Sequence, residues 1–385
     1  PFMRILLTLA VGFGLVGTVH AQNNASTTQS GTGHAILIVQ DSPGPFGAVV
    51  TQTGADNLAD IFQVGPNQAT VEEGGTGNTA LITQDGSGNE AFAFLATVLG
   101  EGNDALIDQV GTANSAGVFN EGVNNDSYVT QTGSGHYGDV LGGFGAADAN
   151  SLAVIVQDGD GHVFGVTQRG EGQLSTIDQD GSDNLAASDQ RDEAHTSTID
   201  QGVSVVGATD SIAGVTQEGV GQVASVTQGQ GDGSRTDVLQ MGDGGLSMVL
   251  QTGSAHGADV TQNGVGNVAD IVQSGDDQTA SIKQVGDRNA STLTQWGADN
   301  RAVDRTSRGN DNTLTITQTD SGNRAVYKVW GDRNVATIHQ SGTDNEVSLD
   351  GRGTPTVPVI GVNDNTITIT QFGGGGHLVE GILAD

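Results

Sequence analysis

The sequence predicts an all-β fold, a parallel β-solenoid of about 15 two-strand coils with cross-β, amyloid-like stacking. Three observations predict it. Glutamines recur eleven residues apart, for example Gln157, Gln168, Gln179, Gln190 and Gln201. Apolar and polar residues alternate before each glutamine, as in a strand. In the consensus repeat a glycine and an asparagine follow the glutamine at fixed offsets, which is typical of a turn. Two such units return the chain over its start, so one coil takes 22 residues.

The composition argues against an ordinary globular core. The chain has 385 residues with 61 Gly, 6 Pro, no Cys and only 4% aromatic residues. Without cysteine, no disulfide framework or cysteine metal site can form. The net charge of -32 disfavours nucleic acid as a partner, because such binding depends on basic residues at phosphates. These numbers alone would suggest disorder, but a disordered chain requires no eleven-residue period.

The first residues are interpreted as an export signal. Pro1 and Phe2 precede Met3 and are taken as non-native, and Arg4 precedes an apolar run that ends at Val19. Small residues at Val19 and Ala21 fit cleavage after Ala21, which makes residues 1–21 a signal peptide. A membrane anchor is the alternative, but the run is short for a membrane span. Residues 22–28 then form a short N-terminal segment, and residues 29–385 form the repeat solenoid of an extracellular protein.

Each repeat follows the pattern Q-x-G-x-x-N-x-A-x-I-x-Q. The stretch from Gln52 to Gln63 and the stretch from Gln262 to Gln273 both contain every element of it. Ala, Ile and Gln alternate with polar residues, so these three share one face of a strand. Gly and Asn favour a turn because both tolerate positive φ and Asn also bonds local backbone. Where Gln is absent the frame persists, with Asn120 and Val329 midway between flanking glutamines.

The amide side chains are expected to point inward and to stack on like side chains of the next coil. A buried amide without a partner costs about 1–3 kcal/mol, which stacking in a ladder avoids. A prion-like disordered segment is the alternative. The predicted ladder residues are Gln52, Asn57, Gln63, Gln84, Asn89, Gln109, Asn114, Gln157, Gln168, Gln179, Asn184, Gln262, Asn267, Gln273, Gln284, Asn289, Gln295, Asn300, Gln318, Asn323, Asn334, Gln340, Asn345 and Gln371. The predicted turn glycines are Gly54, Gly65, Gly86, Gly111, Gly264, Gly275, Gly286, Gly297, Gly331 and Gly342.

Irregular spacings are expected to mark loops and one defective coil. The long spacings run from Gln84 to Val98, Gly142 to Gln157, Gln201 to Gln217 and Gly351 to Gln371. Residues 301–309 form the poorest repeat, with Arg305 where Ile belongs. This repeat is predicted to be either a bulge or a weak point.

Five histidines occupy the Asn position of the repeat, namely His34, His136, His162, His195 and His256. We interpret them as turn hydrogen-bonding groups, and a secondary hypothesis is that acid charges them and loosens the ladders. Asp60, Asp178 and Asp270 are expected on the outward face as solvated charges. No calcium-loop motif is present, and no clustered metal ligands are expected.

No enzymatic motif is present. Gly229, Gly231 and Gly233 match a glycine-rich loop only by chance, because no helix is expected after them. We therefore expect no catalytic residue, no cofactor and no bound metal.

The repeat resembles the curlin repeat of bacterial curli fibres. The resemblance extends over nearly all of the chain from Gln29, and the segment from Thr366 to Gly375 (TITITQFGGG) is especially similar. It implies a secreted amyloid subunit that leaves the cell through an outer-membrane pore. It further implies self-assembly into adhesive biofilm fibres, seeded by a nucleator subunit, with matrix polysaccharide or surfaces as further partners.

Stacking reaches the same expectation independently, because a coil without a cap can template the first coil of another copy. A monomeric solenoid that acts as an adhesin or binds ice is the main alternative, suggested by outward threonines before many glutamines. Asp108, Asp178, Asp200 and Lys283 interrupt that threonine column, however. A nucleator or accessory subunit of the same fibre is a third hypothesis.

Overall fold

The computed structural model confirms the predicted fold class. The chain forms two compact units, Pro1–Ala194 (unit 1) and His195–Asp385 (unit 2). Together they contain about 14 solenoid turns of about 22 residues, close to the expected count. Among the described residues the regular structure is β-strand, and no helix that is long and apolar enough to span a membrane is found there. The structure describes residues 24–41, 45–95, 100–142, 148–202, 208–229, 231–348, 366–372 and 378–379.

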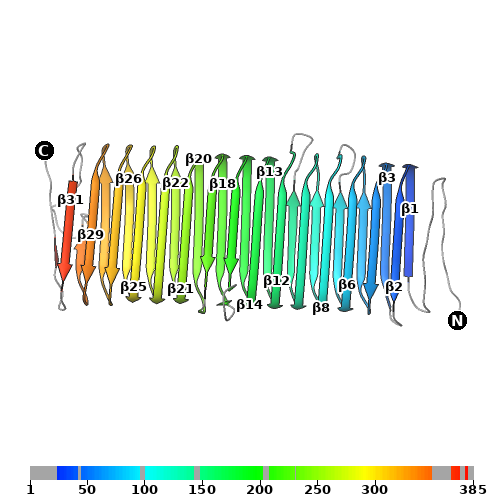
Figure 1. Ribbon diagram of the computed structural model, residues 1–385, viewed down its shortest axis with the longest axis horizontal. Helices are drawn as coiled ribbons and strands as arrows, with labels where there is room; N and C mark the ends of the chain where they lie inside the picture. Colours follow the sequence, from blue (N-terminus) through cyan, green and yellow to red (C-terminus); the bar gives the residue numbers. More distant parts are fainter. Residues whose placement is uncertain are drawn as a thin grey trace. The chain divides into compact units, whose positions relative to one another are not determined.

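Unit 1 contains two parallel sheets whose strands alternate along the chain, so that each strand pairs with the strand two places on (Figure 1). The strands of sheet 1A are β1 (Asn24–Thr32), β3 (Gly47–Ala55), β5 (Gln68–Glu73), β7 (Glu90–Leu95), β9 (Ser115–Asn120), β11 (Tyr137–Gly142), β13 (Val163–Glu171) and β15 (Leu185–Glu193). The strands of sheet 1B are β2 (Ala35–Asp41), β4 (Leu58–Val64), β6 (Thr79–Ser87), β8 (Asp104–Thr112), β10 (Asp126–Ser134), β12 (Leu152–Asp160) and β14 (Leu174–Ser182).

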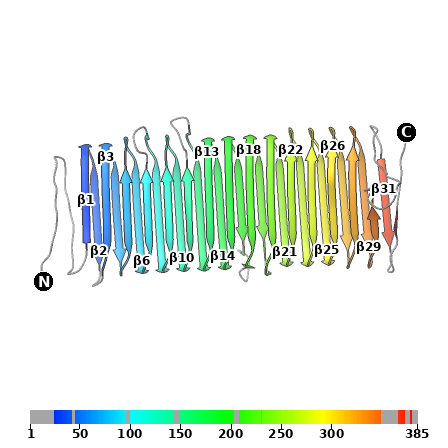
Figure 2. The same ribbon diagram turned by 180° about the vertical axis from the view of Figure 1, so that it is seen from behind.

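Unit 2 repeats this arrangement, as the reverse view in Figure 2 also shows. The strands of sheet 2A are β18 (Ile212–Val220), β20 (Arg235–Asp243), β22 (Gly257–Asn263), β24 (Thr279–Val285), β26 (Arg301–Arg308), β28 (Arg324–Trp330), β30 (Glu346–Ser348) and β32 (Leu378–Val379). The strands of sheet 2B are β16 (Thr196–Gln201), β19 (Val223–Gln228), β21 (Leu246–Ser254), β23 (Val268–Asp276), β25 (Ala290–Ala298), β27 (Thr313–Thr319), β29 (Val335–Ser341) and β31 (Thr366–Phe372), and a short strand β17 (Ala208–Thr209) also belongs to unit 2.

Equivalent positions of the repeat lie directly beside each other in neighbouring strands. Between β6 and β8, Ala80 pairs with Ala105, Ile82 with Ile107, and Gln84 with Gln109. Because side chains alternate between the two faces of a strand, a shift by one residue would bring polar outward residues into the core. The hydrophobic pattern therefore fixes the register of every coil.

The core is a thin layer between the two sheets of each unit. Its small and β-branched side chains lie in columns, such as Ala59, Ala80 and Ala105, all nearly inaccessible to solvent. Ile61 and Ile82 form the parallel column beside them. A core made of such small layers explains how a chain with few aromatic residues buries enough apolar surface to fold.

The turns depend on two positions with positive φ that lie two residues apart. At the end of β6, Gly86 has a φ of 121°, and Gly88, just after the strand, has a φ of 70°. The second position lies in the left-handed region, which Asp and Asn also tolerate. Alanine occupies it at Ala113, where φ is 56°. This backbone conformation is unfavourable for a residue with a Cβ and no side-chain hydrogen bond to offset it.

Ala113→Gly should therefore stabilise unit 1 by about 0.5–1 kcal/mol, because glycine relieves the left-handed strain. Urea unfolding followed by circular dichroism measures the change. Ala116→Gly is the matched control, since Ala116 is buried within β9 outside these positive-φ sites. The control should be destabilised, and stabilisation of both variants or of neither would contradict the strain argument.

One long spacing falls at a different place from the one expected from the sequence. Leu95, eleven residues after Gln84, pairs with Glu73 and Asn120, so it holds the glutamine position of its coil. The extra residues thus follow β7, and Val98 lies outside the described residues. The other insertions contain 143–147, 203–207 and 351–365, which also lie outside them.

The poorest repeat, residues 301–309, contains a bulge, which was one of the two expected alternatives. The assignment of Arg305 to the Ile position was wrong. Asp304 pairs with Ile282 and with Tyr327, and the register then shifts before Ser307. Asp304 is buried and accepts a hydrogen bond from Ser291 Oγ at 2.7 Å. Counting back from Gln318 in steps of eleven gives the correct position for Ser307 but not for the residues before the bulge. The bulge adds one residue, so Asp304 and not Arg305 takes the Ile position.

Candidate functional site: the interior amide ladders

The glutamines of sheet 1B form an unbroken hydrogen-bonded column. In each coil the Gln side chain is buried, and its Nε2 donates to Oε1 of the glutamine in the next coil. The distances lie between 2.7 Å and 2.9 Å. The column contains Gln40, Gln63, Gln84, Gln109, Gln131, Gln157 and Gln179.

A second hydrogen bond, to a backbone carbonyl, fixes the orientation of most of these amides. Gln84 Nε2 also donates to the backbone carbonyl of Gln68 in the facing sheet at 2.9 Å, and Gln109 Nε2 donates to that of Glu90 at 2.9 Å. A flipped amide would bring two oxygens together, so the assignment of N and O follows from the contacts. All donors of the column therefore point toward later coils and all acceptors toward earlier ones.

Sheet 2B carries the same column without interruption. Its Nε2-to-Oε1 distances lie between 2.8 Å and 3.0 Å. The members are Gln201, Gln228, Gln251, Gln273, Gln295, Gln318, Gln340 and Gln371.

The columns of sheets 1A and 2A are interrupted. In sheet 1A, Gln29 donates to Gln52 and Gln168 donates to Gln190, but the four coils between have other residues. Those residues are Glu73, Leu95, Asn120 and Gly142. In sheet 2A, the column runs through Gln217, Gln240, Gln262 and Gln284, and ends where Ser307 and Val329 take the position.

Glu73 places a carboxyl group inside the ladder of sheet 1A. It is 2% exposed, its Oε2 accepts from Gln52 Nε2 at 2.6 Å, and its Oε1 has no hydrogen-bond partner. Burial raises the pKa of this carboxyl to about 8, although the hydrogen bond from Gln52 lowers it. Glu73 is therefore mostly protonated at neutral pH. It was not among the expected ladder residues, although its place eleven residues before Gln84 indicates the position.

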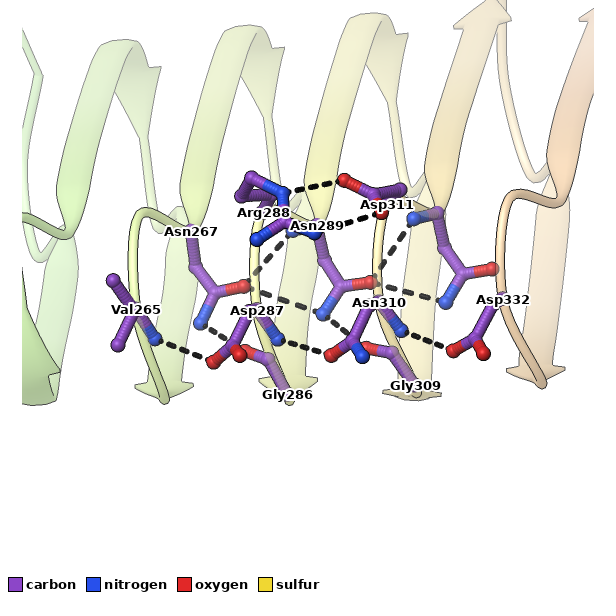
Figure 3. A network of polar contacts seen from close by, with 11 residues as sticks. Val265, Asn267, Gly286, Asp287, Arg288, Asn289, Gly309, Asn310, Asp311 and Asp332 are labelled. Carbon is purple, nitrogen blue, oxygen red and sulfur yellow. Dashed lines mark hydrogen bonds and ion pairs between the residues drawn. The ribbon is translucent and has the colours of Figure 1, made fainter.

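Asparagines at the turns form a second kind of ladder (Figure 3). Asn267 Oδ1 accepts from the backbone N–H of Asn289 at 3.0 Å and from its Nδ2 at 3.2 Å. Asn289 Oδ1 accepts from Asn312 in the same way, and Asn312 Oδ1 from Asn334. Each Nδ2 also donates to a glycine carbonyl in the next coil, for example Asn289 to Gly309 at 2.8 Å. The turn amides thus tie backbone to backbone between coils.

An outer layer of charged and amide side chains surrounds this turn column (Figure 3). The backbone N–H of Val265 donates to Asp287 Oδ1 at 3.0 Å, and that of Asp287 donates to Asn310 Oδ1 at 2.9 Å. Arg288 forms a bidentate ion pair with Asp311, in which Nε lies 2.7 Å from Oδ1 and Nη2 lies 2.9 Å from Oδ2. The guanidinium lowers the pKa of Asp311. These exposed contacts add orientation more than stability.

Glutamine at the turn position is a poorer substitute for asparagine. Gln173, Gln222 and Gln278 are buried there, and the Oε1 of each has no hydrogen-bond partner. The additional methylene moves the amide oxygen away from the backbone N–H of the next coil. Gln278 thus lies below Asn300 as expected from the spacing of 22, but its oxygen does not extend the ladder.

The structure places the expected ladder residues inside the solenoid. Every one of the residues that the sequence proposed for the ladders is buried. The turn glycines named from the sequence have φ angles between 88° and 128°.

Gln131→Met should destabilise unit 1 by about 2–4 kcal/mol. It leaves Gln109 Nε2, Gln157 Oε1 and the Ser115 carbonyl each without one buried partner, at roughly 1–3 kcal/mol per unpaired group. Urea unfolding measures the loss. Thr130→Val on the outward face is the control and should change stability by less than about 0.5 kcal/mol. Equal effects of the two variants would contradict a structural role of the ladder.

The outward faces carry the charge. Asp60, Asp178 and Asp270 are half-buried there, and partial burial raises the pKa of Asp60 and Asp270. Within the part of the chain that the structure describes, no three His, Asp or Glu residues are grouped so that they could hold a metal ion.

Fold and ladders together define a class of protein, the parallel β-solenoid with interior amide columns. The curlin associated repeat family matches this chain in two segments, residues 100–133 and 257–286. One segment lies in each unit, and each segment contains three successive strands with the two reverse turns that connect them. The chain therefore carries curlin-type repeats, and the resemblance inferred from its sequence is confirmed. No curated protein matches it significantly.

Proposed function

We propose that this chain is a structural subunit that assembles end to end into an extracellular, curli-like amyloid fibre. The single observation that carries the proposal is the identity of successive junctions within each unit. Gln pairs with Gln and Gly with Gly at each of the junctions β6–β8, β8–β10 and β10–β12. A surface that binds the next coil of its own chain offers the same pairing to a coil of another copy.

The inward side chains of the first described coil are only partly buried, which supports the addition of another copy at this edge. The inward residues of β1, such as Thr27 and Gln29, are half-buried, whereas Val50 and Gln52 of the next strand are fully buried. In sheet 1B the buried Oε1 of Gln40 has no hydrogen-bond partner. A coil added at this edge would bury apolar surface and could supply a donor to that oxygen.

The further roles follow from the curlin-type repeats. We infer export by a cleaved signal peptide at residues 1–21, passage through an outer-membrane pore, and seeding by a nucleator subunit. The resulting fibre serves cell adhesion, aggregation and the biofilm matrix, with matrix polysaccharide as a possible contact. Its durability would come from the continuous backbone and amide hydrogen bonding along the fibre.

Electron microscopy with thioflavin fluorescence tests assembly. The purified chain is incubated alone and with sheared fibres of the same protein as seeds. The proposal predicts unbranched fibrils and a lag phase that the seeds remove. Soluble monomers that persist even with seeds would contradict it and favour a monomeric adhesin. An ice-binding role is not favoured, because in sheet 1B Asp108 lies between Thr83 and Thr130 on the outward face.

A further inference from the structure

Two histidines occupy successive positions of one turn column in unit 1. His136 follows β10 and His162 follows β12, and their side chains are 1% and 0% exposed. Their rings are stacked, with centroids 5.1 Å apart and planes inclined by 11°. The column continues to Asn114 on one side and to Asn184 on the other.

Each imidazole reproduces the two hydrogen bonds of an asparagine. His136 Nδ1 accepts from the backbone N–H of His162, and His162 Nδ1 accepts from that of Asn184, both at 3.2 Å. The Nε2 atoms lie 3.0 Å from the carbonyls of Thr132 and Asp158. A carbonyl can only accept and an amide N–H can only donate, so each ring carries its proton on Nε2 and none on Nδ1.

A second proton has no place in this arrangement. It could bind only at Nδ1, where it would oppose the backbone N–H of the next coil. Two charged rings in stacking contact would also repel each other. The carboxylates that act on the rings are Asp158 and Asp160 for His136, and Asp180 and Asp183 for His162. They attract an imidazolium, but none of them replaces the hydrogen bond that protonation removes.

We propose that the stacked pair His136 and His162 is an acid-sensitive joint of unit 1. When both rings are neutral, the pair connects the turn after β10 to the turns after β12 and β14. When either ring takes up a second proton, the connection breaks and the coils separate locally at that turn. The joint is a property of the folded chain, so its test does not depend on assembly.

The direction of the pH dependence follows from burial. Burial lowers the pKa of both histidines below the ordinary value of 6.5, and for His162 the neighbouring His136 lowers it further. A group whose pKa is depressed in the closed state stabilises that state above its open-state pKa, and the stability is lost as the pH falls through the closed-state pKa. Between these two values each histidine raises the opening constant by up to about ten-fold per pH unit.

The other buried turn histidines show what is special about the pair. His256 also lies 3.0 Å from a carbonyl through Nε2, but its Nδ1 has no hydrogen-bond partner. A second proton there breaks no bond between coils. His195 accepts from the N–H of Gln222, so the next residue of its column is a glutamine and not a second histidine. We therefore expect the largest acid response at the pair.

Hydrogen exchange of the full chain at pH 7.5 and pH 5.0, corrected for the intrinsic exchange rate, tests the joint. We expect the opening constants at the amides of His162 and Asn184 to rise at least about ten-fold on acidification. The amides of Asn289 and Asn312, which bond to asparagine oxygens, should not respond. Unchanged protection at His162 and Asn184 would overturn the proposal.

Two matched variants separate titration from simple destabilisation. His136→Asn with His162→Asn should keep the amides protected and abolish their acid response, since Asn89, Asn114 and Asn184 fill this position in the same column. Asn300→His with Asn323→His should introduce an acid response into unit 2 at the amide of Asn345. An acid response that survives in the first variant would contradict the assignment to the pair.

Discussion

Gly86→Ala is expected to lower the free energy of unfolding by at least about 3 kcal/mol, or to prevent folding. Gly86 lies near the end of β6 with a φ of 121°, a region that L-residues rarely adopt. An added Cβ would meet the carbonyl oxygen of Gly111 at 1.8 Å. That oxygen belongs to the backbone of the next coil, so it can move only if the two coils separate.

Gly77→Ala is the matched control for this prediction. Gly77 also has a positive φ, 69°, but a Cβ there would meet nothing within 4 Å. Alanine adopts a similar conformation at Ala113 and Ala255. The control should therefore lose only about 1 kcal/mol. Urea unfolding of both variants measures the difference, and losses of equal size would show that backbone conformation rather than coil-to-coil approach is what requires glycine.

Glu73→Gln should stabilise unit 1 by about 3 kcal/mol at pH 7. The variant removes the buried carboxyl and supplies an amide that can accept from Gln52 in the regular way. The pKa of Glu73 is raised from 4.5 to about 8 in the folded chain. Its contribution is thus fully present below pH 4.5 and is lost as the pH rises toward 8. Above that the ionised carboxylate is buried without a cation.

Stability measured by urea unfolding from pH 5 to pH 8.5 tests this sign. In the unmodified chain the stability should fall with rising pH by up to about 1.4 kcal/mol per unit, and in Glu73→Gln this slope should disappear. Glu72→Gln removes the same charge from the exposed neighbouring position and should leave the slope unchanged. A slope that disappears in both variants would indicate a general charge effect, and a slope that persists in both would contradict the shift.

Much of the fold could be read from periodicity. The offsets between Gln52, Asn57, Ala59 and Ile61 predict that these residues face inward, and all four are buried. The offset of Gly54 predicts a turn glycine, and its φ is positive. Periodicity is informative here because every coil has the same neighbours. The hydrophobic effect and the hydrogen-bond requirement then select the same side chain at the same position each time.

The departures were predictable only in part. The register shift at Asp304 arises from a single extra residue, and a sequence count cannot place it, since Asp304 and Arg305 are equally unsuited to the Ile position. Asn and Gln differ at the turn position in whether the side-chain oxygen reaches the backbone N–H of the next coil. The difference is one methylene group, and the Oε1 of Gln278 has no hydrogen-bond partner. The tautomer of His136 can be assigned only when the backbone N–H that faces its Nδ1 is known, and this N–H is seen only in the three-dimensional structure.

Disulfide formation between introduced cysteines tests most directly whether like positions lie over like. The chain has no cysteine of its own. Thr294 and Thr317 are outward neighbours in β25 and β27, whereas Thr315 pairs with Thr292. A cysteine pair at 294 and 317 would have Cα atoms about 5 Å apart and should oxidise readily within one molecule. A pair at 294 and 315 would be roughly 8 Å apart and should not. Equal oxidation of both pairs, or cross-links between molecules only, would contradict the in-register stacking on which the whole account depends.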